Sequence, residues 1–230
     1  SFPEALQKIN SDLTLLLDAT QEPIKSNRQL AQEVPKFEIK RKQFNEAEKG
    51  FWLKFGIDEQ TLKRFNVSSL EEFSTTSKIG NPYTTKSSFD KFIFAYESDN
   101  WVKLYKPLDE KKYKFQYLGT KEQGFIFGWK QLPENADLLI ITGGEKDVIT
   151  LTAKGFNAIT LNSETATLPK SIVDELKLRF KTILVLYDND ETGLKQSNIL
   201  AVAHGLHRLV LPTLQNNGKD VSDYFANGET

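Results

Sequence analysis

Residues 183–193 read ILVLYDNDETG, an apolar run that leads directly into two aspartates, Asp188 and Asp190, and then a glycine. An apolar run of this length predicts a buried strand, so the two acids lie at the carboxyl end of that strand. In an open parallel sheet, ligands bind outside the carboxyl ends of the strands. The stretch therefore predicts a divalent-metal site at a sheet edge, with metal-dependent phosphate chemistry as the leading function.

The segments on both sides of this stretch alternate between apolar strands and helices. Strands are predicted over 138–142, 157–161, 182–187 and 208–211, and helices over 147–154, 168–180 and 193–204. Such alternation predicts a parallel sheet covered by helices on both faces. A polar break at residues 132–137 predicts a domain boundary near residue 135.

The residues before this boundary have a different pattern. Aromatic and β-branched residues alternate with lysine, serine and threonine over 83–129, which predicts a β-rich meander. Residues 50–73 predict two short helices, with Asp58 or Ser68 as caps. We therefore expect a smaller, basic α+β subdomain over residues 48–135 and a parallel-sheet domain over residues 136–230.

The first 47 residues predict little regular structure beyond one helix. Apolar residues recur at helical spacing over 2–17, which predicts an amphipathic helix. Residues 21–49 contain two prolines, few large apolar side chains and a basic cluster, and so predict a linker or an irregular surface segment.

The composition is that of an ordinary soluble protein, with 230 residues, 39% hydrophobic residues and a net charge of -1. Cysteine is absent, which excludes disulfides, cysteine-based zinc sites and thiol nucleophiles, and favours the cytoplasm. No apolar run approaches the roughly 20 residues that span a bilayer, and the first residues do not resemble a signal peptide, so we expect no membrane association. Methionine is also absent, so we expect the chain to be a piece of a longer protein.

Lysines and aromatic residues are interleaved over residues 101–121. Lysines bind a nucleic-acid backbone and aromatic rings stack on its bases, so this mixture is typical of a nucleic-acid surface. The alternative interpretation is a solvated antiparallel sheet whose aromatic residues face inward.

Three acidic loops follow predicted strands. They are residues 142–147, which contain Glu145 and Lys146, residues 188–190, and residues 218–223, which contain Asp220. If the strands are neighbours, carboxylates from all three loops converge on one crevice, where their oxygens would hold Mg²⁺ or Mn²⁺. Three of the acids in these loops also have a structural interpretation, because Asp190 can cap the following helix, Asp147 can lie in the first turn of its helix, and Asp220 can lie in a solvated turn.

The order of these motifs is familiar. Residues 138–225 resemble a Toprim domain, the metal-binding fold that DnaG-type primases, topoisomerases and some nucleases share. The resemblance rests on the glycine-rich turn with Asp147, the loop 162–167, the Asp188 and Asp190 pair with Gly193, and residues 219–220. It implies a Rossmann-like parallel sheet with helices on both faces, preceded by a smaller α+β basic subdomain.

The segment before the Toprim-like region points to primases within this group. The stretches KYKFQYL (residues 112–118) and GFIFGW (residues 124–129) resemble the basic subdomain that precedes Toprim in bacterial primases and phage-type primase-helicases. Residues 1–6 resemble the last helix of the zinc-binding module that precedes the polymerase core. The zinc ribbon with its cysteines is not in this chain.

The resemblance implies the RNA-polymerase core of a DNA primase, of the kind that phages, plasmids and other mobile elements carry. Such a core joins ribonucleoside triphosphates on single-stranded DNA and works with a replicative helicase in the same chain or in another. It implies catalysis and metal binding by Glu145, Asp188 and Asp190, with Asp220 as a further metal ligand. The implied contacts to nucleic acid or nucleotide come from Lys106, Lys114, Lys121 and Lys146.

Two positions depart from the family pattern. In the last motif, Ser222 stands where an aspartate is often found, and Asp223 follows it directly. The more important departure is Gly143, which stands where the first Toprim motif has a glutamate. Either Glu145 reaches the metal crevice from a rearranged turn, or the domain keeps a partial metal site and has weak or no nucleotidyl transfer. Two further functions therefore stay open. One is a catalytically degenerate Toprim domain that binds nucleic acid or a helicase, and the other is a Toprim nuclease.

Overall fold

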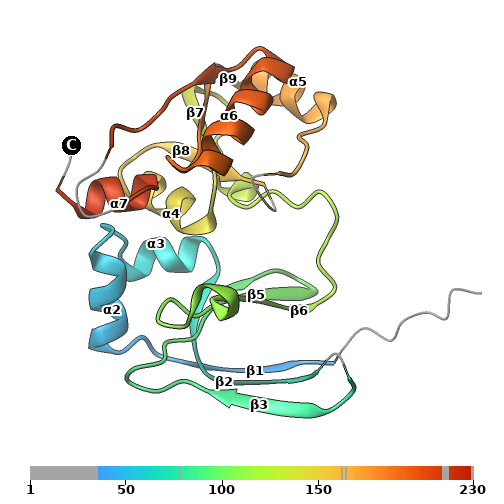
Figure 1. The fold of residues 1–230 in the computed structure, drawn as a ribbon, viewed down its shortest axis with the longest axis vertical. Helices are drawn as coiled ribbons and strands as arrows, with labels where there is room; N and C mark the ends of the chain where they lie inside the picture. The colour runs from blue at the N-terminus through green and yellow to red at the C-terminus, as the bar shows by residue number, and fades with distance from the viewer. Residues whose placement is uncertain (1–35, 78, 162, 164, 214–217, 229–230) are drawn as a thin grey trace, which may run out of the picture. The chain divides into compact units, whose positions relative to one another are not determined.

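The computed structural model describes residues 36–228, apart from residues 78, 162, 164 and 214–217 (Figure 1). The contacts place all described residues in one unit. The helix predicted over 2–17 lies outside the described residues. So do the first part of the linker predicted over 21–49 and part of the loop 162–167.

Six strands in the first part of the described chain form an antiparallel sheet. The sheet path runs β1-β2-β4-β5-β6, and β3 pairs with β2. The strands are β1 (Glu38–Lys42), β2 (Val67–Thr76), β3 (Pro82–Lys86), β4 (Phe94–Glu97), β5 (Trp101–Tyr105) and β6 (Phe115–Gly119). The β-rich meander predicted over 83–129 is therefore confirmed.

Part of the segment predicted as linker is a strand, so that prediction was wrong for residues 38–42. Strand β1 pairs antiparallel with β2, and Arg41 forms an ion pair with Glu97 at the end of β4. Only Ile39 of this strand packs against the hydrophobic core. Basic side chains protect an edge strand from pairing with other chains, and their presence here gave the strand the composition of a linker.

Four short helical segments accompany this sheet: α2 (Glu46–Leu53), α3 (Glu59–Arg64), and the 3₁₀ turns η1 (Lys111–Tyr113) and η2 (Trp129–Gln131). Helix α2 begins at a capping box, in which Asn45 accepts from the Glu48 amide and Glu48 accepts from the Asn45 amide. Asp58 caps α3, as predicted. Ser68 lies in β2 instead, so the prediction that it caps a helix was wrong.

Four parallel strands form the second sheet, in the order β10-β9-β7-β8. The strands are β7 (Ala136–Thr142), β8 (Asn157–Thr160), β9 (Phe180–Leu186) and β10 (His207–Arg208). The helices are α4 (Glu145–Ala153), α5 (Lys170–Arg179), α6 (Glu191–His204) and α7 (Val221–Ala226). This is the parallel sheet that the apolar strands predicted, except that the last strand is the two-residue β10 and not the segment predicted over 208–211. Strand β7 begins beside the domain boundary that we propose near residue 135.

Helices cover both faces of the parallel sheet (Figure 1). Leu176 of α5 and Leu200 of α6 pack with alternate residues of β7 and β9 in one core. Val148 of α4 and Val221 of α7 pack on the opposite face. This second core also contains Trp52 and other aromatic residues of the antiparallel part, so one continuous apolar layer joins the two sheets.

None of the helices in the described ranges has the length and the apolar character that crossing a bilayer requires.

Candidate metal and nucleic-acid site

Asp188 and Asp190 close around one cation, the ammonium group of Lys219. Asp188 follows the end of β9, and Asp190 caps α6, where it accepts a hydrogen bond of 2.9 Å from the Gly193 amide. Lys219 Nζ lies 2.8 Å from a carboxylate oxygen of Asp188 and 2.6 Å from one of Asp190. The structure thus brings these two predicted site residues within reach of a single positive charge.

The backbone that carries this pair is held on two sides. A Cβ atom at Gly193 would lie 2.2 Å from the carbonyl oxygen of Asp188, so only glycine lets the first turn of α6 approach the loop this closely. On the other side, the Asn189 amide donates a 2.7 Å hydrogen bond to the Lys219 carbonyl oxygen. The spacing of the two carboxylates is therefore set by packing of the backbone.

The environment affects the two aspartates differently. Burial raises the pKa of Asp188 above its ordinary value, and the nearby charges of Asp220 and Asp190 add to this effect, while the hydrogen bond from Lys219 opposes it. The hydrogen bond from Lys219 lowers the pKa of Asp190, and the Gly193 amide adds to that effect. Burial alone would lower the pKa of Lys219, but its hydrogen bonds with both carboxylates raise it overall.

Glu145 pairs with a lysine of the other sheet. It is the first residue of α4, and its carboxylate oxygens lie 2.6 and 2.7 Å from Nζ of Lys103 in β5. The two side chains are only 11% and 12% exposed. This ion pair links the parallel-sheet part to the antiparallel sheet, and it gives Glu145 a partner other than the Lys219 cation.

Asp147 is buried and holds α4 against α7. The hydroxyl and the amide of Ser222 both donate hydrogen bonds to the same carboxylate oxygen. Burial raises the pKa of Asp147 well above its ordinary value, and the negative charge of Asp220 adds to this. The position of Asp147 in the first turn of a helix, which was its structural interpretation, is confirmed.

Asp220 caps α7 and faces Lys146. Its side chain accepts a hydrogen bond of 2.7 Å from the Asp223 amide, and Lys146 Nζ lies 3.3 Å from its carboxylate. The same ammonium lies 4.3 Å from the ring centroid of Phe55. Burial opposes the charged form of Lys146, but the carboxylates of Asp220 and Asp147 raise its pKa overall. Asp220 is therefore both a helix cap and one partner of an ion pair.

The other three predicted nucleic-acid contacts lie along the β5–β6 hairpin. Lys106 follows β5 and lies 3.5 Å from Asp109, and Lys114 follows η1. Lys121 donates a 3.1 Å hydrogen bond to the hydroxyl of Tyr117 and lies 4.3 Å from the centroid of that ring. These three lysines thus belong to the antiparallel sheet, whereas Lys146 belongs to the acidic loops.

The sequence analysis included Lys103 in a lysine-rich stretch and Lys219 in the last motif, but it gave neither of them a role in the site. Lys219 could have been found, because it adjoins Asp220 in an acidic loop that follows a strand. Lys103 alternates with Trp101 and Tyr105 in β5, which places it on the same face as these aromatic residues. No local signal, however, indicates that this face meets Glu145.

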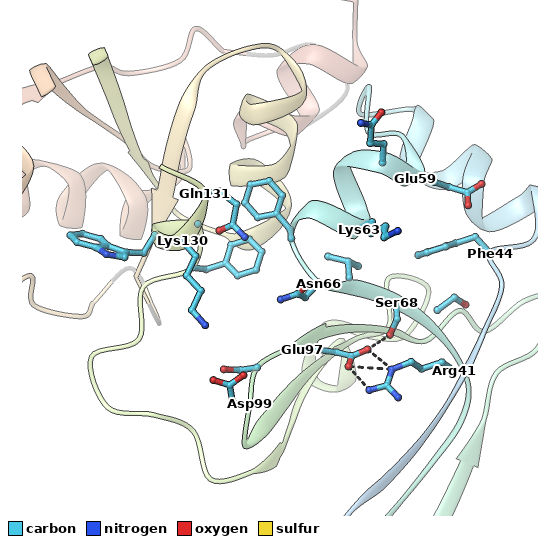
Figure 2. Close-up of a pocket in the computed structure, with 18 of the residues that line it drawn as sticks. Arg41, Phe44, Glu59, Lys63, Asn66, Ser68, Glu97, Asp99, Lys130 and Gln131 are labelled. Carbon is cyan, nitrogen blue, oxygen red and sulfur yellow. Dashed lines mark hydrogen bonds and ion pairs between the residues drawn. The ribbon is translucent and has the colours of Figure 1, made fainter. Parts of the chain in front are cut away.

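A pocket with a volume of about 980 Å³ lies elsewhere in the described part of the chain. Its walls come from the end of β1, α3, the start of β2, the β4–β5 turn and residues 125–131. The acids of the candidate metal site, which are Glu145, Asp147, Asp188, Asp190 and Asp220, do not line it. Figure 2 shows Lys63 and Lys130 on different walls, and the carboxylate of Glu97, which accepts hydrogen bonds from Arg41 and from the hydroxyl of Ser68. A cavity therefore lies beside the antiparallel sheet, apart from the acids of the candidate metal site.

The four carboxylates that the sequence predicted as metal ligands fit a divalent metal only in part. Mg²⁺ commonly uses one or two carboxylates and completes its shell with waters and substrate phosphates. Asp188 and Asp190 meet that requirement, because they already converge on one cation. Glu145 and Asp220 are engaged with other lysines, and the described ranges contain no group of three or more His, Cys, Asp or Glu side chains placed to hold a metal ion.

Comparison by sequence gives no family assignment. No protein-family model matches the chain. No curated protein sequence matches it either.

Comparison of the fold finds solved structures of primases. The primase fragment of the bacteriophage T7 primase-helicase protein is 18% identical, with a TM-score of 0.51 over 82% of this chain and 76% of that one. A DnaG primase catalytic domain bound to single-stranded DNA is 14% identical, with a TM-score of 0.58 over 80% and 71%. A DNA primase domain from Pseudomonas aeruginosa is 16% identical, with a TM-score of 0.53 over 80% and 68%. The described chain therefore has the mixed α/β fold of primase catalytic cores.

Proposed function

We propose that this chain is the catalytic core of a DNA primase, which synthesises short RNA primers on single-stranded DNA by metal-dependent nucleotidyl transfer. The observation that carries the proposal is the convergence of Asp188 and Asp190 on one cation at the carboxyl end of β9. The fold supports nucleotidyl transfer over other phosphate chemistries, because solved primase cores have the same fold.

Asp188 and Asp190 would hold Mg²⁺ or Mn²⁺ in place of the Lys219 ammonium. Lys219 is 45% exposed and can move into solvent when the metal enters. Asp220, whose charge already acts on Asp188, is the next ligand available. When bound, the metal would offset the negative charge that develops on the phosphoryl group.

The reaction joins a hydroxyl oxygen to the α-phosphorus of a ribonucleoside triphosphate and releases pyrophosphate. We assign Glu145 to the side of the attacking hydroxyl, where it must first release Lys103. Lys146, together with Lys106, Lys114 and Lys121, would bind the template backbone or the triphosphate as point charges. A replicative helicase, in the same protein or in another, would deliver the single-stranded template.

Primer synthesis on single-stranded DNA with Mg²⁺ or Mn²⁺ tests the proposal. We expect product from the wild type and from Lys181→Gln, a control at an exposed ion pair with Asp137, and none from Asp188→Ala. Equal product from the wild type and Asp188→Ala would defeat the mechanism. Primer synthesis by Glu145→Ala then decides whether Glu145 does the work of the family glutamate that is missing at position 143.

A second candidate is a catalytically degenerate domain that binds nucleic acid. The observation that favours it is the Lys103–Glu145 ion pair, because Glu145, the acid nearest to Gly143 in the sequence, already has a partner. This candidate predicts salt-dependent DNA binding without nucleotide incorporation. A Toprim nuclease would instead shorten labelled single-stranded DNA when Mg²⁺ or Mn²⁺ is present, so the same reaction products separate the three functions.

A further inference from the structure

Two large aromatic side chains on β6, which would normally be buried in a core, are exposed to solvent. Strand β6 is at the edge of the antiparallel sheet, and Phe115 and Tyr117 are 47% and 39% exposed. Leu118, on the opposite face, is buried in the core of the sheet. Residues two apart in a strand share a face, so the two rings form a short row.

Positive charges surround this row. Lys103 Nζ lies 4.6 Å from the centroid of Phe115 and 5.7 Å from that of Tyr117. Lys121 lies 4.3 Å from the Tyr117 centroid. In the adjacent turn, Lys112 lies 4.6 Å from the ring of Tyr113, which is itself 55% exposed. A surface of rings and ammonium groups is complementary to a chain of bases and phosphates.

The row connects the acidic loops to the large pocket. At one end, Lys103 also binds Glu145 at the start of α4. At the other end, the ring centroids of Tyr117 and Trp101 lie 5.8 Å apart. Trp101 also makes an edge-to-face contact with Phe125, which lines the pocket, and their ring centroids lie 4.8 Å apart. The pocket then presents Lys63 and Lys130 from two walls (Figure 2). Aromatic and basic groups thus link the two places as a track, and the ring between Tyr117 and Phe125, that of Trp101, is itself buried, with 4% exposed.

We propose that Phe115 and Tyr117 stack the bases of the single-stranded template, and that the strand continues past Trp101 into the pocket, where Lys63 and Lys130 bind its phosphates. The identity of this strand as a template rests on the proposed function. Residues two apart in a strand are separated by about 6.6 Å, a spacing at which an extended single strand can place one base on each ring. Base stacking is tolerant of sequence, so the track suits a template of any sequence.

Fluorescence anisotropy with labelled dT20 tests the track directly. We expect the Phe115→Ala, Tyr117→Ala double variant to bind at least about 25-fold more weakly, since the loss of one stacked ring costs about fivefold or more. The Phe115→Trp, Tyr117→Trp variant should bind like the wild type, because stacking is kept. Phe89→Ala is the matched control, because Phe89 is 87% exposed and lies outside the track.

The pocket end is tested by the salt dependence of the same binding. Replacing Lys63 and Lys130 by glutamine should reduce the slope of log K against log salt by about 1.4, which is about 0.7 for each lost phosphate contact. Circular dichroism and the urea midpoint establish that each variant folds. A parallel titration with fluorescent ATP distinguishes a template track from a nucleotide site. If the track binds the template, the affinity of each variant for ATP should stay within about twofold of the affinity of the wild type.

The outcomes separate this inference from the proposed function. The track is refuted if the Phe115→Ala, Tyr117→Ala variant and the Lys63→Gln, Lys130→Gln variant both bind dT20 within about twofold of the wild type. This holds even if Asp188→Ala abolishes primer synthesis. If the alanine variant weakens the binding of ATP and not that of dT20, the surface is a nucleotide site and the inference fails. If the stacking variants lose dT20 while the wild type makes no primer, the track stands and the polymerase proposal falls.

Discussion

Gly193→Ala is the most informative single substitution, because the structure fixes the sign of its effect. A Cβ atom at this position would lie 2.2 Å from the carbonyl oxygen of Asp188 and 2.9 Å from the carbonyl carbon and the amide nitrogen of the same residue. The obstacle is backbone, so relief requires that the Asp188 loop or the first turn of α6 move by about 1 Å. Overpacking costs about 1 to 3 kcal/mol, and because the obstacle here is backbone that no change of rotamer can relieve, we take the upper part of that range, about 2 to 3 kcal/mol.

Helix propensity works in the opposite direction. Alanine is more favourable than glycine in a helix by at most about 1 kcal/mol. The net expectation is a loss of about 1 to 2 kcal/mol in the free energy of unfolding. For a unit of this size each kcal/mol shifts Tm by about 2 to 4 °C, so the expected decrease is about 2 to 8 °C.

Gly50→Ala is the matched control. Gly50 lies within α2, and a Cβ atom there would meet nothing within 4 Å. Only the propensity difference acts at this position, so we expect stabilisation of up to about 1 kcal/mol. Urea unfolding of both variants, with the slope m checked for constancy, measures the two values. If Gly193→Ala were as stable as the wild type or more stable, the close approach of α6 to the Asp188 loop would be wrong.

Two further predictions concern other contacts of the fold. Ser222→Ala removes the hydroxyl that donates to the buried Asp147 carboxylate, so we expect a loss of about 1 to 3 kcal/mol in urea unfolding, and an unchanged midpoint would contradict that contact. Burial alone would raise the pKa of Glu97, but hydrogen bonds from Arg41 and Ser68 lower it overall, so its contribution is present at neutral pH and is lost as the pH falls below about 4. The stability difference between the wild type and Glu97→Gln should therefore shrink between pH 6 and pH 3, and a constant difference would refute this account.

The sequence alone predicted most of the parallel sheet. Strands β7, β8 and β9 are largely buried, so their apolar runs are visible without knowledge of their neighbours, whereas both residues of the edge strand β10 are exposed. The same reasoning failed for β1, where charged side chains protect a sheet edge and only Ile39 packs inward. It also placed the start of α2 too late, because the capping box at Asn45 lies within the basic segment that was interpreted as linker.

The sequence also determined where the acids of the site lie, since a carboxylate that follows a buried strand must emerge at the edge of its sheet. Tertiary structure alone decided which cation each acid meets. Asp188 and Asp190 share Lys219, which is about 30 residues away in the chain, and Glu145 meets Lys103 of the other sheet. The pattern of a strand sets the direction of its side chains, but the packing of two sheets against one apolar layer decides what those side chains touch.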